Sequence, residues 1–98
     1  MPFDRSNLPP RAQELFRTTQ RFAAGMMRGP EFETAYQDLR MEAEHNLPPL
    51  IQDVISEIFY GVDDYVAKDS LREPEKGDLD EEQLREIVRA QLQRLDEA

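Results

Sequence analysis

The chain has 98 residues, no cysteine, and 21 acidic against 12 basic side chains, which gives a formal net charge of −9. This length fits one domain, and the missing cysteines exclude disulfides and thiolate chemistry. The acidic excess disfavours nucleic acid and anionic lipid as partners and favours a basic protein. No segment approaches the roughly 20 apolar residues that cross a bilayer, and the N-terminus lacks the apolar run of a signal peptide. We therefore expect a cytoplasmic protein with no membrane contact.

The first half of the chain predicts two helices, because apolar side chains recur there at helical spacing. We expect a flexible arm over residues 1–8 and then a helix over residues 9–27, which begins with two prolines, tolerated in a first turn. A Gly-Pro pair at residues 29–30 ends this helix, because proline disfavours helical geometry in the residue before it. A second helix follows over residues 31–45.

The third helix, over residues 48–67, has the clearest apolar stripe of the chain. Gly61 lies at the edge of this stripe, which indicates a close contact with a neighbouring helix. The apolar positions are Leu50, Ile51, Val54, Ile55, Ile58, Phe59, Val62, Tyr65 and Val66.

Residues 68–79 lose helical periodicity, and we interpret them as a polar loop. Asp80 and Gln83 then have the spacing of a capping box at the start of a fourth helix, over residues 80–96. No segment alternates with the period of a strand. Four amphipathic helices with mostly short connections predict a single all-α domain over residues 1–98, an antiparallel four-helix bundle.

Two patterns resemble metal sites but are incomplete. Glu42 and His45 have the spacing of a di-iron helix motif, which needs a second such motif, whereas this chain has one histidine. Asp78, Asp80 and Glu82 begin like a calcium loop, but the glycine and the final glutamate of that loop are missing. The serines lack a plausible base, and there is no glycine-rich phosphate loop. We therefore expect no enzyme, no metal and no cofactor.

Three arginines near the C-terminus, Arg85, Arg89 and Arg94, are a candidate phosphate-binding group. They alternate with Glu86 and Asp96. We interpret them as a solvated helix face.

One polar stripe on the third helix has a more specific pattern. Asp53, Glu57, Tyr60 and Asp64 are spaced four, three and four residues apart, so they fall on one face, opposite the apolar stripe. Asp63 lies beside them. The helix places no lysine or arginine on this face, although like charges along a helix repel one another. The stripe is either a solvated surface or a binding face for a cationic partner, with Tyr60 as its aromatic anchor.

Several short motifs occur in a characteristic order. They are Arg-Phe-Ala-Ala-Gly-Met at 21–26, Gly-Pro-Glu-Phe-Glu at 29–33, Tyr36, Ile-Ser-Glu-Ile-Phe at 55–59, Val-Asp-Asp-Tyr at 62–65 and Leu-Asp-Glu-Glu-Gln-Leu at 79–84. This order resembles the colicin D immunity-like proteins, including immunity proteins of contact-dependent growth inhibition systems, over roughly residues 15–95. The resemblance implies a four-helix bundle that binds a cognate toxin domain, typically a tRNA-cleaving nuclease. It also implies that acids occlude the toxin's active site where RNA phosphates would lie.

The leading hypothesis is therefore an immunity protein, expected to be a monomer, that binds and neutralises a basic nuclease toxin domain. The alternatives are an acidic helical adaptor or regulatory subunit for a basic nucleic-acid-binding protein, and a helical enzyme subunit whose site a partner completes. The predicted partner-binding residues are Asp53, Glu57, Tyr60, Asp63, Asp64, Asp69, Glu73, Glu75 and Asp78.

Overall fold

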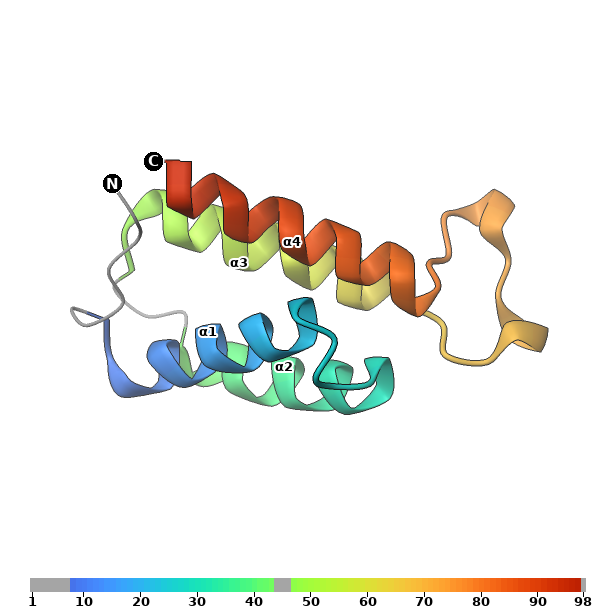
Figure 1. The fold of residues 1–98 in the computed structure, drawn as a ribbon, viewed down its shortest axis with the longest axis horizontal. Helices are drawn as coiled ribbons and strands as arrows, with labels where there is room; N and C mark the ends of the chain where they lie inside the picture. Colours follow the sequence, from blue (N-terminus) through green and yellow to red (C-terminus); the bar gives the residue numbers. More distant parts are fainter. Residues whose placement is uncertain (1–7, 44–46, 98) are drawn as a thin grey trace.

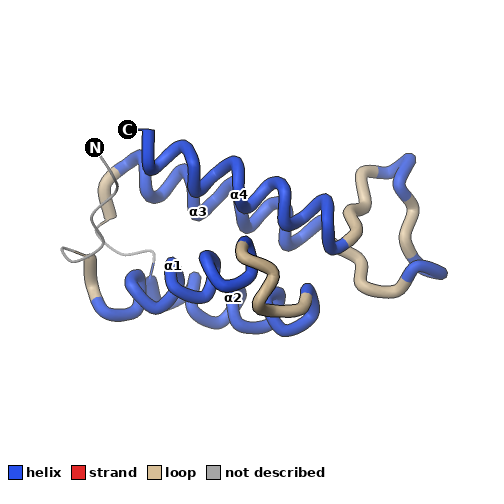
Figure 2. Tube along the Cα trace, in the orientation of Figure 1, coloured by secondary structure: helices blue, strands red, loops and turns tan. Residues whose placement is uncertain are grey.

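The protein forms an antiparallel bundle of four α-helices (Figures 1 and 2). The computed structural model describes residues 8–43 and 47–97. Within them the helices are α1 (Pro10–Ala23), α2 (Gly29–Ala43), α3 (Pro49–Asp64) and α4 (Glu81–Glu97), and there is no strand. Each helix packs against two neighbours, so that α1 and α3 lie diagonally across the bundle. The predicted all-α fold is confirmed.

A single apolar core runs through the bundle. The rings of Phe22 and Phe32 stack with their centroids 4.2 Å apart, which joins α1 to α2. The buried hydroxyl of Tyr36 donates a hydrogen bond of 2.7 Å to the backbone carbonyl of Ile55, which joins α2 to α3. The predicted apolar stripe supplies the core side of α3 through Ile51, Val54, Ile55, Ile58 and Val62.

Helix α1 ends at Ala23, a turn before the end expected at residue 27. Gly25 has a φ of +79°, a left-handed conformation that glycine adopts without strain. The N–H of Met26 donates to the carbonyl of Arg21 at 2.9 Å, the long-range bond of a Schellman motif. The helix therefore stops at this glycine, before the Gly-Pro pair that starts α2.

Helix α3 ends at Asp64, so the prediction that Tyr65 and Val66 continue its stripe is wrong. Tyr65 pairs with Leu79 as an isolated parallel bridge. The N–H of Val66 donates to the carbonyl of Leu79 at 3.0 Å, and the N–H of Leu79 donates to the carbonyl of Asp64 at 2.9 Å. The backbone N–H of Val66 thus bonds to Leu79 and not to a carbonyl within the helix, as continuation of α3 would require. Tyr65 is nevertheless buried, as its apolar character required.

Helix α4 begins where the capping box predicted. The N–H of Gln83 donates to Oδ1 of Asp80 at 2.8 Å, and the N–H of Asp80 donates to Oε1 of Gln83 at 2.9 Å. The close contact expected at Gly61 is also present, because a Cβ there would lie 3.2 Å from Cδ1 of Leu84. The first turns of α4 thus pack directly on the backbone of α3.

Some sequence expectations fall outside the described residues. The structure does not describe residues 1–7, 44–46 and 98. The pairing of Glu42 with His45 and most of the expected arm therefore lie outside the described residues. Leu8, which was assigned to the flexible arm, is buried in the core. In the part of the chain described, no helix combines the length and apolar character needed to cross a membrane.

The buried stripe of α3 predicts a large effect on stability. Ile58 is 1% exposed, so Ile58→Ala should lower the free energy of unfolding by about 2–5 kcal/mol, measured by urea denaturation. The exposed Gln37 on α2 provides the control, and Gln37→Ala should change it by less than about 0.5 kcal/mol. Equal effects of the two variants would contradict this packing.

Candidate functional site

One end of the bundle gathers most of the predicted binding residues. At this end α1 and α3 terminate, α2 and α4 begin, and the segment between α3 and α4 extends beyond the helices (Figure 1). We call it the loop end. Of the nine predicted residues, Asp53 lies on α3 toward the opposite end, whereas the others lie on the last two turns of α3 or in the segment that follows.

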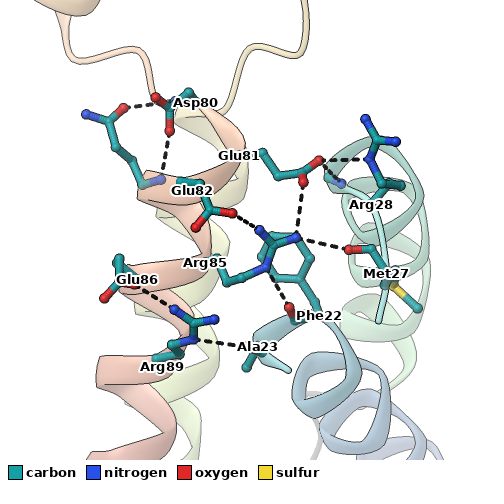
Figure 3. Close-up of polar contacts among 12 residues, drawn as sticks. Phe22, Ala23, Met27, Arg28, Asp80, Glu81, Glu82, Arg85, Glu86 and Arg89 are labelled. Carbon is teal, nitrogen blue, oxygen red and sulfur yellow. Dashed lines mark hydrogen bonds and ion pairs between the residues drawn. The ribbon is translucent and has the colours of Figure 1, made fainter. Parts of the chain in front are cut away.

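The loop end is organised around the buried guanidinium of Arg85 on α4 (Figure 3). Arg85 is 6% exposed. Its Nε donates to the carbonyl of Phe22 at 2.9 Å, and its Nη2 donates to the carbonyl of Met27 at 3.2 Å. The guanidinium also lies 4.6 Å from the centroid of the Phe22 ring. The carboxylates of Glu81 and Glu82 complete its shell as ion-pair partners.

The prediction that Arg85, Arg89 and Arg94 form a solvated face is wrong for Arg85, whereas the side chains of Arg89 and Arg94 are 46% and 40% exposed. Arg85 is buried, and Nε of Arg89 donates to the carbonyl of Ala23 at 2.9 Å. The last carbonyls of a helix lack partners inside it, and cations there also interact favourably with the helix dipole. Arg85 and Arg89 therefore cap the C-terminus of α1 from another helix.

Glu81 links α4 to the start of α2. Its Oε1 accepts a hydrogen bond of 2.6 Å from the N–H of Gly29, and its Oε2 lies 3.1 Å from Nη2 of Arg85. Arg28 approaches the same carboxylate at 3.7 Å. The hydrogen bond from Gly29, followed by the bond and charge of Arg85, holds the pKa of Glu81 below its ordinary value of 4.5, although partial burial opposes this.

The predicted polar loop is an ordered structure with two short 3₁₀ turns, η2 (Asp69–Leu71) and η3 (Pro74–Lys76). Arg72 fixes the first turn, because its Nε and Nη2 donate to the carbonyl of Val66 at 3.0 and 2.8 Å. Its Nη1 donates to Oδ1 of Asp69 at 2.7 Å. The bridge between Tyr65 and Leu79 closes the base of the loop.

Most acids of the loop have partners within the loop. Asp69 pairs with Arg72, Glu73 pairs with Lys76 at 2.7 Å, and Oδ2 of Asp78 accepts a hydrogen bond of 2.9 Å from the N–H of Glu73. The charges of these acids are largely balanced locally.

The polar stripe of α3 is exposed, as predicted, but its members differ in their surroundings. Asp53 accepts a hydrogen bond of 2.8 Å from Nη2 of Arg94, so α4 supplies a cation to a face that α3 itself leaves without one. Tyr60 is 59% exposed. Glu57, Asp63 and Asp64 form no ion pair with any residue in 8–43 or 47–97. We refer to these three as the α3 acid cluster.

Two members of the cluster oppose the helix dipole. Asp63 and Asp64 lie in the last turn of α3, which contains no basic residue, whereas α1, α2 and α4 each have an arginine there. A negative charge at the C-terminal end of a helix is unfavourable by about 0.3–1 kcal/mol. The cluster therefore lowers the stability of the bundle, which is an arrangement typical of a binding surface.

The described residues contain no group of three or more His, Asp or Glu side chains placed to hold a metal ion. The chemistry available at the loop end is thus that of exposed carboxylates, one exposed phenol and an ordered loop. A small helical bundle with this surface belongs to the class of acidic protein-binding modules.

The family follows from comparison with known proteins. A family model for bacterial self-protective colicin-like immunity matches residues 14–95, and the chain belongs to this family. It is therefore an immunity protein that neutralises a toxin, and the predicted resemblance is confirmed at the family level. No curated protein matches the chain individually.

Glu81 predicts part of the acid sensitivity of the fold. Because its pKa is lower in the folded state, its carboxylate stabilises the fold fully above about pH 4.5, and this contribution is lost as the pH falls through the lowered value. In urea titrations between pH 7 and pH 2, Glu81→Gln should therefore lose less stability than the parent. Glu86→Gln, at an exposed ion pair, is the control. If the free energy of unfolding fell equally with decreasing pH in the parent and in Glu81→Gln, this role of Glu81 would be contradicted.

The helix dipole predicts that the cluster can be made more stable. Asp63→Lys and Asp64→Lys should each raise the free energy of unfolding by about 0.3–1 kcal/mol at low ionic strength, and by less in high salt. Asp38→Lys, at an exposed position in the middle of α2, should have a smaller effect. Destabilisation by both α3 variants would show that these acids support the fold.

Proposed function

We propose that the cognate toxin is a basic nuclease domain that cleaves RNA, typically tRNA, and that the loop end of the bundle covers its active site in the cytoplasm. Membership of the colicin-like immunity family supports a toxin as the partner. The net charge of −9 supports a basic one. The same mechanism would serve against a basic toxin domain that reaches the cell as a colicin or by contact-dependent growth inhibition.

The observation that supports this mechanism most directly is the α3 acid cluster. Asp63 and Asp64 occupy the unfavourable end of their helix dipole without a basic side chain in the same turn. A nuclease that grips RNA presents lysine and arginine to phosphates. Carboxylates placed along one helix end compete for the same cations and accelerate association through long-range attraction.

The other predicted residues take different roles around this cluster. Tyr60, beside Glu57 and Asp64 on the helix surface, is the aromatic anchor. Asp69, Glu73 and Asp78 hold the shape of the loop through their local contacts. The list of proposed contacts is completed by the exposed Glu75 in the loop and by Asp53 at the periphery, where Arg94 already balances its charge.

Neutralisation by this surface requires only stoichiometric binding by a monomer. We propose that the chain has no catalytic activity of its own and needs neither metal nor cofactor. The adaptor alternative shares the basic partner but not the toxin, and membership of an immunity family favours the toxin.

The mechanism predicts that reversing the cluster abolishes protection. The test uses a candidate toxin domain, namely the C-terminal domain of any large secreted protein that a neighbouring gene encodes. The triple variant Glu57→Lys, Asp63→Lys, Asp64→Lys should lose measurable binding to that domain in titration calorimetry and should no longer protect cells that produce it. Its helical circular dichroism should be retained and its unfolding midpoint should not fall, because all three side chains are exposed and two of the changes relieve the unfavourable helix dipole.

A matched control separates local charge from net charge. Asp38→Lys, Glu86→Lys, Asp96→Lys changes exposed acids on α2 and α4 by the same total charge and should keep binding and protection. Tyr60→Ala should weaken binding by at least about 1 kcal/mol. If the triple cluster variant binds and protects like the parent, the proposal that the α3 acid cluster blocks the toxin is contradicted.

A further inference from the structure

Leu71 is an exposed apolar side chain on the ordered loop. It is 64% exposed and ends the turn η2 (Asp69–Leu71), at the outer edge of the loop in Figure 1. Its neighbours in the loop are mostly charged. Exposure of one leucine is ordinary on a protein surface, so its meaning depends on how the loop holds it.

The backbone around Leu71 is held in one conformation. Its own N–H donates to the carbonyl of Lys68 at 3.0 Å, and the N–H of Arg72 donates to the carbonyl of Asp69 at 3.2 Å. The guanidinium of Arg72 adds two hydrogen bonds to the carbonyl of Val66. A side chain presented by a preformed turn loses little conformational entropy on binding, which is the property of an effective anchor.

The loop is also continuous with the α3 acid cluster. The carbonyl of Asp64, a member of the cluster, accepts the hydrogen bond from Leu79 that closes the base of the loop. The loop therefore starts directly where the cluster ends, within reach of a partner that contacts the end of α3.

We propose that Leu71 is a specificity-determining anchor that inserts into an apolar recess beside the basic surface of the toxin domain. This inference rests on the proposed function. Nucleases that act on unpaired RNA hold bases on apolar and aromatic side chains next to the cations that bind phosphate. Leucine and neighbouring carboxylates on one ordered surface match that combination of an apolar site with a cationic one.

The two parts of the surface make different kinetic contributions. The acid cluster acts before contact and sets the association rate and its salt dependence. Leu71 acts only after contact, so it sets the dissociation rate and is insensitive to salt. This separation distinguishes an apolar anchor from one more element of the charged surface.

The test measures binding kinetics of the full chain with the same neighbour-encoded toxin domain, by surface plasmon resonance at several salt concentrations. Leu71→Ser should accelerate dissociation at least about tenfold, with the association rate and its salt dependence unchanged. Leu71→Met should bind like the parent. The unfolding midpoint of both variants should match the parent, because the side chain lies outside the core.

Met41→Ser is the matched control, because Met41 is equally apolar and 73% exposed but lies on α2. It should leave both rates unchanged. If Leu71→Ser binds within about twofold of the parent while the triple cluster variant does not bind, the inference fails and the proposed function stands. An equal loss with Met41→Ser also overturns the inference. A parent that does not bind the toxin domain at all overturns both.

Discussion

The arrangement of the loop end depends on the burial of Arg85. A buried guanidinium is tolerated only when its donors are satisfied. Here the carbonyl of Phe22 at the end of α1, the carbonyl of Met27 in the connection to α2 and two carboxylates from the start of α4 satisfy them. The same contact fixes where α4 begins relative to α1, and Glu81 extends it to the first N–H of α2. Helix α4 also packs on Gly61 of α3. The network and this contact together position both ends of the segment that connects α3 to α4.

At the end of α3, by contrast, the acids of the last turn lower the stability of the fold, because they oppose the helix dipole. Acids occupy the first turns of α2 and α4, and an arginine lies in the last turn of α1, α2 and α4, although α2 and α4 also have acids there. Only α3, among the helices described, has acids and no base in its last turn. Two exposed acids without a base in the same turn are consistent with selection for binding at that site.

Periodicity and capping chemistry were sufficient to predict the helices, because both are local. Asp80 and Gln83 are three residues apart and exchange two hydrogen bonds. The core stripe of α3 is predicted from the spacing of its apolar residues alone. Arg85 could not be predicted in the same way, because its carbonyl partners belong to Phe22 and Met27, far away in sequence.

The end of α3 and the pairing of Asp53 with Arg94 depend on similar distant contacts. The exposure of the candidate surface could be predicted from the sequence. Which of its acids pair with a basic side chain could be seen only in the folded structure. Leu71 had one sequence signal, an apolar residue within a charged loop, and the polar interpretation of that loop missed it.

Charge and shape answer different requirements of an immunity protein. With a basic toxin domain of the proposed kind, an acidic helix end would attract cognate and non-cognate domains alike over roughly a Debye length of 8–10 Å. Discrimination must come from groups that act at contact. The loop is suited to this task, because Arg72 holds its turn through bonds within the loop itself. Substitutions at its exposed tip leave the Arg85 network and the core unchanged. Partner choice can therefore change there without loss of the fold.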